Sequence, residues 1–529
     1  MDAYIEFRNV VKKFDDFVAL DHVSLQIPKG AFVTLLGPSG CGKTTLMRQL
    51  AGFSEPEEGD VLVDGKRMNG LPPFKRNTPL VFQEYALFPH MTVYENISYG
   101  LKLKKAPKEE KDRKVAEMLE MFNLQGLDGR FPKQLSGGQQ QRVAFARALV
   151  MGQEILLLDE PSNDIDIETL EWLEKLIMEA PQPVLFISHD ETLIERTANM
   201  VIHIEQLKRK TESCCSIAKT GYRQYAKKRA EQLASQEQRA LVERREEKKR
   251  QEKFRRIEQA VNHDLNSMTR QNPHGGYLLK KKMKAVKSLE KRYEREALDR
   301  TEIPETEDAI FFKLGEAVKM PAGKTVLEFS LDRLLTPVSG EEEPRLLAEH
   351  LFLRIKGGER VCITGKNGAG KTTLLKQMAE KLLSRTDVRA CYMPQNYEDL
   401  LEPDRTPVDF LSVTGDKEET TRIRTYLGSM KYTVDEMNAP MSELSGGQKA
   451  KVLLLKMSLS GADVLILDEP TRNFSPLSGP VIRAILRQYR GAILSISHDR
   501  KYIEEVCTAV YQLTPGGLFR LLPESWNKC

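Results

Sequence analysis

Residues 159–172 read DEPSNDIDIETLEW. Two acidic residues end the apolar run ILLL, and a polar turn then leads into a helix. An apolar run of this kind favours a buried strand, which holds two carboxylates rigidly at one edge of a sheet. One carboxylate in such a place suits a metal ion, and its neighbour suits a general base that polarises a water molecule. The stretch therefore predicts one half of a hydrolytic site, whose other parts lie elsewhere in the chain.

The chain carries this stretch twice, together with three other motifs in the same order. The repeated motifs are GPSGCGKTT and GKNGAGKTT at 37–45 and 365–373, LSGGQ at 135–139 and 444–448, ILLLDEP and LILDEP at 155–161 and 465–470, and ISHD at 187–190 and 496–499. In both copies the aspartate of DEP lies 20 residues after the glutamine of LSGGQ and 30 residues before the histidine of ISHD. Two copies of one α/β nucleotide-binding fold explain both the order and the spacing.

The glycine-rich motifs match GxxxxGK[ST], a loop that wraps phosphates. Its glycines bring successive backbone N–H groups to a helix N-terminus, where the helix dipole favours an anion. We expect Lys43 and Lys371 to neutralise the outer phosphates of ATP, and Thr44 and Thr372 to ligate Mg²⁺. The predicted nucleotide-binding residues of the two loops are Gly37, Pro38, Ser39, Gly40, Cys41, Gly42, Lys43, Thr44, Thr45, Gly365, Lys366, Asn367, Gly368, Ala369, Gly370, Lys371, Thr372 and Thr373.

The acidic pairs complete the predicted chemistry. Asp159 and Asp468 suit the metal ion, while Glu160 and Glu469 suit the general base that polarises the attacking water. ATP and Mg²⁺ are therefore the predicted cofactors, and hydrolysis of ATP to ADP and phosphate is the predicted reaction.

With these motifs in this order, both halves of the chain resemble the ABC ATPases, over nearly all of residues 1–205 and 305–510. The resemblance implies that each ATP is sandwiched between two cassettes, so that ATP binding closes the pair and hydrolysis opens it. It implies that Gln83 and Gln395 contact Mg²⁺ and water, that His189 and His498 contact the γ-phosphate, and that Phe14 stacks on adenine. The implied signature loops, which cap the nucleotide held by the other cassette, are Ser136, Gly137, Gly138, Gln139, Ser445, Gly446, Gly447 and Gln448.

The two copies differ at positions that this resemblance makes important. Copy two has no aromatic residue between 331 and 350, where adenine stacking would be expected. Asp166 stands where ABC ATPases carry an aspartate that communicates across the pair, and copy two has Ser475 there. We therefore predict that the two ATP sites are not equivalent.

A basic segment lies between the copies. Residues 206–300 hold 27 Lys and Arg against 13 Asp and Glu, although the whole chain has a net charge of only +4. Phe254, Ile257, Val261 and Leu265 recur at helical spacing, as do Met283, Val286, Leu289 and Tyr293, and 266–277 contains the Pro and Gly of a turn. We predict an antiparallel helical hairpin over 206–304 between an ATPase domain at 1–205 and another at 305–529. A solvated linker with a lysine excess is the alternative.

Composition narrows the class of protein. No apolar run approaches the roughly 18 residues of a membrane span. The seven cysteines include no CxxC pair, so neither a disulfide framework nor a zinc site is indicated. We predict a cytoplasmic protein with no transmembrane segment of its own.

Different parts of the chain resemble two different branches of the ABC ATPases. Residues 1–150, with VFQEYALFPHMTVYENISYGLKLKK and LSGGQQQRVAFARALV, resemble importer ATPases of the polyamine, sulfate and iron type. From about residue 154, EPSNDIDIETLEWLE, LDEPTRNFSPLSGPVIRAIL and GAILSISHDRKYIEEVC resemble the ABC-F proteins, and specifically their antibiotic-resistance branch.

The ABC-F resemblance implies a soluble twin-cassette ATPase whose cassettes pair within the chain. Its hairpin would contact ribosomal RNA and the P-site tRNA, and ATP binding and hydrolysis would protect translation from antibiotics. The alternative is the ATP-hydrolysing subunit of a membrane importer of the spermidine type, whose partner would be a permease. A third class, the chromatin or DNA-repair ATPases, is disfavoured because the coiled coils of those proteins are far longer than this segment.

Overall fold

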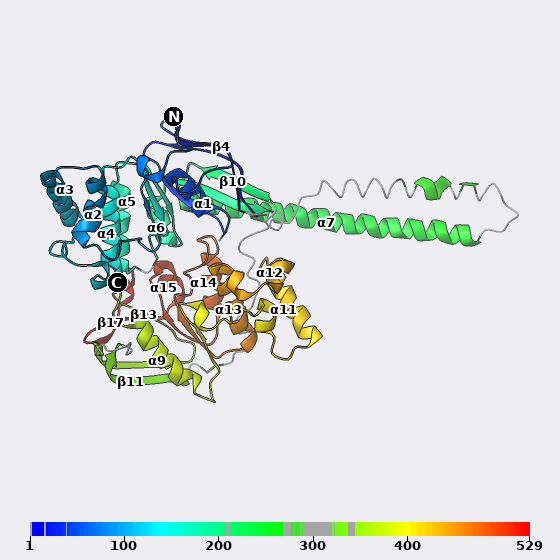
Figure 1. The fold of residues 1–529 in the computed structure, drawn as a ribbon. Coiled ribbons are helices and arrows are strands. Elements are labelled where there is room, and N and C mark those ends of the chain that lie inside the picture. The colour runs from blue at the N-terminus through cyan, green and yellow to red at the C-terminus, as the bar shows by residue number, and fades with distance from the viewer. Residues whose placement is uncertain are drawn as a thin grey trace. The chain divides into compact units, whose positions relative to one another are not determined.

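The computed structural model describes residues 3–14, 17–38, 40–163, 165–207, 212–267, 277–278, 281–285, 288, 320–321, 323–336 and 344–528. We call the described part of 3–218 cassette 1 and that of 320–528 cassette 2 (Figure 1). The two cassettes belong to one compact unit, and the described residues of 223–306 belong to another. None of the helices in the described ranges is both long enough and apolar enough to cross a membrane.

Cassette 1 is built on a six-stranded sheet in the order β10-β9-β3-β8-β7-β6. All neighbouring strands are parallel except β10, which pairs antiparallel with β9. The bounds are β3 Phe32–Leu36, β6 Leu80–Val81, β7 Leu156–Asp159, β8 Val184–Ile187, β9 Met200–Leu207 and β10 Glu212–Ala218. The central strands are apolar and buried, as parallel strands covered on both faces must be.

An antiparallel sheet and six α-helices complete the described part of cassette 1. The sheet has the order β2-β1-β4-β5, with β1 Ala3–Phe14, β2 Phe17–Pro28, β4 Glu58–Val63 and β5 Lys66–Arg67. The helices are α1 Lys43–Ala51, α2 Val93–Leu103, α3 Lys108–Met121, α4 Gly137–Leu149, α5 Ile167–Glu179 and α6 Glu191–Thr197.

Cassette 2 repeats this plan, so the predicted duplication is confirmed. Its six-stranded sheet has the order β14-β15-β16-β13-β17-β18, which matches the first sheet strand for strand from the opposite end. The strands are β11 Thr325–Leu335, β12 Leu346–Lys356, β13 Arg360–Thr364, β14 Ala390–Met393, β15 Val464–Asp468, β16 Ala492–Ile496, β17 Ala509–Thr514 and β18 Gly517–Arg520. The helices are α9 Lys371–Leu383, α10 Pro407–Leu411, α11 Lys417–Ser429, α12 Val434–Asn438, α13 Gly446–Ser460, α14 Gly479–Gln488 and α15 Arg500–Val506.

The strand order explains why the equal spacing of the motifs in the two copies gives each cassette the same kind of site. The phosphate loop follows β3 or β13, the acidic pair ends β7 or β15, and the histidine follows β8 or β16. These strands are neighbours and parallel, so their carboxyl ends meet at one edge of the sheet. Each cassette therefore gathers its three motifs at that edge.

The basic segment contains a long helix, α7, over Tyr222–Ser267. At 46 residues it is about 70 Å long, so the long first arm of the predicted hairpin is present. Its sequence is rich in Ala, Gln, Glu, Lys and Arg, which are good helix formers, and contains no proline or glycine. Of the turn predicted at 266–277, residues 266 and 267 still belong to α7, and residues 268–276 lie outside the described residues, as does most of the second arm. The antiparallel hairpin therefore remains a prediction.

Candidate ATP sites

Each phosphate loop leads from a buried strand into a helix. Gly42 precedes α1 with a φ of 97°, and Gly370 precedes α9 with a φ of 92°. These left-handed conformations favour glycine. A Cβ atom on Gly42 would also lie 2.5 Å from the carbonyl oxygen of Ala19. The glycines thus let the loop close tightly on the first N–H groups of the helix, which suits an anion.

The loop lysines fold back over their own loops. Nζ of Lys43 donates to the carbonyl oxygens of Gly37 at 2.7 Å and Pro38 at 2.8 Å. Lys371 makes the equivalent pair of bonds at 2.8 and 3.0 Å. Both lysines are buried, and these partners are neutral carbonyls. Their positive charge is therefore available to an anion in the loop.

The strand-end aspartates have properties that suit a cation ligand. Burial raises the pKa of Asp159 and of Asp468 to about 6. Thr44 Oγ1 donates to Asp159 Oδ1 at 3.4 Å, and Asp468 Oδ2 has no hydrogen-bond partner in the described part of the chain. A desolvated carboxylate with an unused oxygen gains strongly from a divalent cation.

Magnesium fits this donor set. Mg²⁺ is usually held by one or two carboxylates together with substrate phosphates, because it dehydrates reluctantly. No cluster of three His, Cys, Asp or Glu that could hold a metal occurs among the described residues. Each cassette offers one threonine hydroxyl and one aspartate, with Gln83 or Gln395 as a further predicted oxygen ligand, so the phosphates of the nucleotide would complete the coordination.

The two candidate bases share a backbone strain and differ in charge. Glu160 and Glu469 have backbone φ values of 50° and 53°, which residues other than glycine rarely adopt. Burial by itself would raise the pKa of Glu160, but hydrogen bonds from His189 and Asn163 bring it down to about 2. Burial raises the pKa of Glu469 to about 8, and the charge of Asp468 adds to the rise.

His189 explains the ionised state of Glu160. Its Nε2 lies 3.1 Å from Glu160 Oε1, and its Nδ1 lies 2.6 Å from the backbone carbonyl oxygen of Phe474 in cassette 2. The ring of His189 thus bridges the candidate base of cassette 1 and the backbone of cassette 2. The side chain of Asn163 also donates to Glu160 at 2.6 Å.

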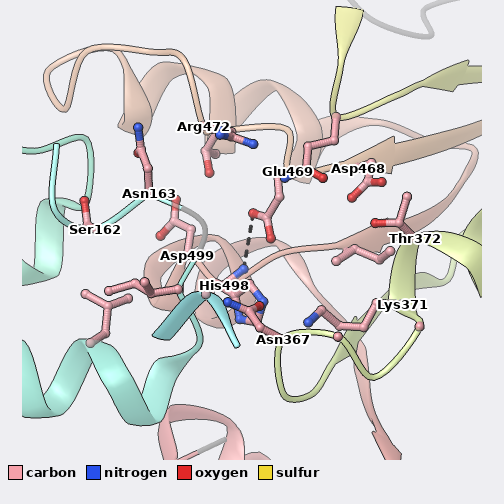
Figure 2. Close-up of a pocket in the computed structure, with 18 of the residues that line it drawn as sticks. Ser162, Asn163, Asn367, Lys371, Thr372, Asp468, Glu469, Arg472, His498 and Asp499 are labelled. Atoms are coloured by element: carbon pink, nitrogen blue, oxygen red, sulfur yellow. Dashed lines mark hydrogen bonds between the residues drawn. The ribbon is translucent and has the colours of Figure 1, made fainter. Parts of the chain in front are cut away.

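His498 has different surroundings. Its backbone N–H donates to Glu469 Oε2 at 3.3 Å (Figure 2), while its Nδ1 is buried without a partner in the described residues. Burial, followed by the charge of Lys371, lowers the pKa of His498 to about 3. The ring is therefore neutral, and it lines the cavity of cassette 2 instead of holding the base.

The site of cassette 2 is a composite cavity of about 500 Å³. Figure 2 shows Lys371, Thr372, Asp468, Glu469 and His498 around it, with Ser162 and Asn163 of cassette 1 on the opposite side. The remaining lining residues are Gly137, Ile165, Leu170, His189, Asp190, Thr336, Leu347, Asn367, Gly368, Gly370, Thr373, Gln395, Thr471, Arg472, Ile496 and Asp499. Gly137 belongs to the signature loop of cassette 1, so a loop predicted to cap the other cassette's nucleotide does face that site.

Asp166 links the cassettes at this cavity. Its Oδ2 accepts from the backbone N–H of Asn367, in the phosphate loop of cassette 2, at 3.5 Å. Glu168 forms a 3.0 Å ion pair with Lys366 beside it, and Ile167 is buried among apolar residues of cassette 2. At the matching position in cassette 2, the Ser475 hydroxyl is buried and has no hydrogen-bond partner in the described ranges. The asymmetry predicted from Asp166 and Ser475 therefore has a structural counterpart.

The positions of the other predicted nucleotide-binding residues do not establish their predicted roles. Gln395 lines the cavity, but Gln83 and the loop Ser445–Gln448 do not. Ser445 instead caps α13 in a reciprocal arrangement with Gln448, as Ser136 caps α4 with Gln139. Phe14 is 48% exposed at the end of β1, with Lys12 5.3 Å from its ring. Ser39 lies outside the described residues, and the individual roles of all these residues remain predictions.

Sequence reasoning missed Asn163 and Arg472. Each follows its candidate base by three residues, and each lines the cavity. Asn163 donates to Glu160, whereas the charge of Arg472 acts to lower the pKa of Glu469. The signal was available as a difference between the copies, DEPSN against DEPTR, at equal distance from the catalytic pair.

Comparison with known proteins agrees with this geometry. The family model described as ABC transporter matches residues 20–163 and 348–472, together just over half of the chain. The segments include both phosphate loops, both signature loops and both acidic pairs. The cassettes are thus nucleotide-binding, ATP-hydrolysing units.

Several curated proteins match part of the chain. Spermidine/putrescine import ATP-binding proteins from Oleidesulfovibrio alaskensis and Nitrosospira multiformis are 48% and 50% identical over 194 and 198 residues, 36% of this chain and 52% and 54% of their own lengths. A sulfate/thiosulfate import ATP-binding protein from Mycolicibacterium paratuberculosis is 43% identical over 209 residues, 39% of this chain and 58% of its own length. The chain thus spans only a little more than half the length of these relatives.

Among solved structures, the dimeric bacterial ABC transporter cassette MJ0796 is 33% identical. The match has a TM-score of 0.35 and covers 38% of this chain and 94% of that one.

We expect the double variant Glu160→Gln, Glu469→Gln to bind ATP but to lose turnover by about 10²–10⁴-fold, because it lacks a positioned proton acceptor. Steady-state phosphate release measures the rate, and binding of a fluorescent ATP analogue checks that the sites are intact. A rate within about threefold of the parent would remove these glutamates from the role of base.

The single variants should differ in their pH dependence. Glu160→Gln leaves Glu469, which must lose its proton to act, so activity should rise as the pH passes through about 8. Glu469→Gln leaves Glu160, whose pKa of about 2 keeps it ionised throughout that range, so its profile should be nearly flat. ATPase rates between about pH 6 and pH 9 give the comparison, and superimposable profiles would show that the two environments have no mechanistic effect.

Proposed function

Since the chain belongs to the ABC transporter family and carries two of its cassettes, we propose that it is a twin-cassette ATPase that binds the ribosome and protects translation from antibiotics. The observation that carries this proposal is α7, a long basic helix inserted between the two cassettes. ATP binding would close the cassette pair, and hydrolysis would open it. The hairpin would couple this cycle to ribosomal RNA and the P-site tRNA.

The residues at each site supply the steps of hydrolysis. The phosphate loop and its lysine would hold the phosphates, and Thr44 with Asp159, or Thr372 with Asp468, would hold Mg²⁺. When bound, that ion neutralises charge on the phosphates. Glu160 or Glu469 would accept a proton from the attacking water, and His498 would contact the terminal phosphate in cassette 2. His189 first has to leave Glu160 if it is to do the same in cassette 1.

The composition of α7 supports a polyanionic partner. The helix holds 13 Lys and Arg against 8 Asp and Glu. Its central basic side chains are exposed, and they are Arg244, Arg245, Lys248, Lys249, Arg250, Arg255 and Arg256. A straight helix of about 70 Å holds such charges at fixed spacing along its length. That arrangement suits the regularly spaced phosphates of RNA, which supply affinity through release of counterions.

The importer relatives favour a second candidate, the ATP-hydrolysing subunit of a membrane importer. This function requires a permease that docks on cassette 1, and it gives the basic helix no task. Fractionation of cells that express the Glu160→Gln, Glu469→Gln chain separates the two functions, because hydrolysis-deficient cassettes accumulate in the ATP-bound state. With ATP present, we expect the chain in ribosomal fractions, and its recovery in membrane fractions would favour import.

Reversal of charge on α7 should weaken ribosome binding and reduce its dependence on salt. We expect Lys248, Lys249, Arg255 and Arg256, all replaced by Glu, to lose phosphate contacts, so that affinity measured by ribosome pelleting falls and the slope of log affinity against log salt becomes shallower. The ATPase rate of the isolated protein should stay near that of the parent, since no candidate ATP-site residue lies on α7.

The matched control reverses four exposed lysines of cassette 1, Lys102, Lys104, Lys105 and Lys108, and changes the net charge equally. Equal losses of affinity in both variants would mean that net charge, and not the helix, provides binding. Unchanged affinity in the α7 variant would reduce the helix to a spacer and overturn the proposal.

A further inference from the structure

Four buried charges join the two cassettes. Arg500 on α15 donates to Glu174 on α5, and Arg483 on α14 donates to Glu191 on α6 at 2.9 Å. The side chains of these residues are between 3% and 10% exposed. We call these four residues the charge cluster. Its acids all come from cassette 1 and its bases all come from cassette 2.

The cluster occupies only two positions of the repeated fold. Glu174 and Arg483 each lie 15 residues after the aspartate of their DEP motif, and Glu191 and Arg500 each lie 32 residues after it. The same positions therefore carry opposite charges in the two cassettes. A pair of similar folds related by an approximate twofold axis brings the first position of each against the second position of the other. The two cross-cassette pairs have this pattern.

The pattern discriminates between possible cassette pairs. Two copies of cassette 1 would place Glu174 against Glu191 twice, and two copies of cassette 2 would place Arg483 against Arg500 twice. Like charges that meet in a buried interface are strongly unfavourable, because neither the partner nor water compensates them. Only cassette 1 against cassette 2 gives two attractive pairs.

We infer that the charge cluster specifies pairing of cassette 1 with cassette 2 and prevents either cassette from pairing with a copy of itself. This goes beyond the proposed function, because it concerns which surfaces assemble and would hold for a ribosomal or a membrane ATPase.

Neighbouring charges extend the same segregation. Lys501 of cassette 2 pairs with Glu191 at 2.9 Å and with Glu195 at 2.6 Å, both in cassette 1. Asp190 lies 3.6 Å from Arg500, but the matching residue of cassette 2, Asp499, is also an acid, so this position does not distinguish the cassettes. Two pairs run within a cassette, Arg196 with Glu174 and Arg483 with Glu505. Their outer members, Arg196 and Glu505, are 50% and 42% exposed, so water screens their charges. The buried members, Glu174 and Arg483, therefore act mainly on their partners across the interface.

The test uses three full-length variants. The all-basic chain carries Glu174→Arg and Glu191→Arg, the all-acidic chain carries Arg483→Glu and Arg500→Glu, and the exchanged chain carries all four changes. The first two place like charges together within the chain. We expect each to lose ATPase activity by at least about tenfold, because the ATP sites need both cassettes. The exchanged chain restores two attractive pairs with reversed polarity and should recover most of the activity.

Mixing the all-basic and all-acidic chains gives the decisive measurement. Cassette 1 of either chain then complements cassette 2 of the other. Activity should return, rise with the product of the two chain concentrations, and coincide with a two-chain mass in light scattering. Loss of activity in the single-polarity chains without recovery in either the exchanged chain or the mixture would overturn the inference. Full activity in the all-basic chain would overturn it as well.

Milder substitutions test the same pairs if a charge-reversed chain fails to fold. Glu191→Gln and Arg483→Gln, made singly and together, form a double-mutant cycle for one pair. We expect each single change to lower activity, and the combined change to cost less than the sum of the two. Strict additivity would mean that Glu191 and Arg483 do not recognise one another.

Discussion

Two adjacent buried carboxylates cannot both be ionised unless something positive stands beside them. This constraint applies at the end of β7 and again at the end of β15. The other groups of each site supply positive charge or hydrogen-bond donors that offset the two carboxylates. A lysine bends over the phosphate loop, a threonine hydroxyl faces the aspartate, and a helix N-terminus points at the same space. The nucleotide then brings both anions and the cation that balances them. The glutamate, in its strained backbone conformation, is the one group that must keep a lone pair free for water.

The two cassettes meet this constraint in different ways. In cassette 1, a histidine and an asparagine bind the base, and the histidine is also tied to a backbone carbonyl of the other cassette. In cassette 2, the histidine ring is neutral and the base carries a raised pKa. The histidine that lowers the pKa of Glu160 is therefore also held by a contact between cassettes, whereas the residues that shift the pKa of Glu469 all belong to cassette 2. Movement of one cassette relative to the other acts directly on the first base and only indirectly on the second.

Much of this arrangement could be predicted from the sequence, because it rests on spacing. Equal intervals between motifs required equal folds, and parallel strands brought the phosphate loop, the acidic pair and the histidine to one edge. Asp166 does contact the phosphate loop of cassette 2, and its role in communication across the pair stays a prediction. The contact of His189 with Phe474 could not be predicted, since the carbonyl oxygen lies 285 positions away in the sequence. Nor could the charge cluster, because residues on α5 and α6 reveal their partners only when the second cassette is in place. Asn163 and Arg472 were visible as a difference between copies, but a difference alone assigns no contact.

The position of the charge cluster has a consequence for the history of such chains. Its determinants sit on two helices of each cassette and lie outside the motifs that bind and hydrolyse ATP. A first cassette of foreign descent could therefore be grafted onto this second cassette and still be accepted, provided that it carried acids at the two matching positions. The resemblances in the sequence predict a change from importer-like to ABC-F-like sequence near residue 154, ahead of both acids. Recombination at that point would exchange the phosphate loop, the signature loop and α4. It would leave the two acids of the charge cluster unchanged.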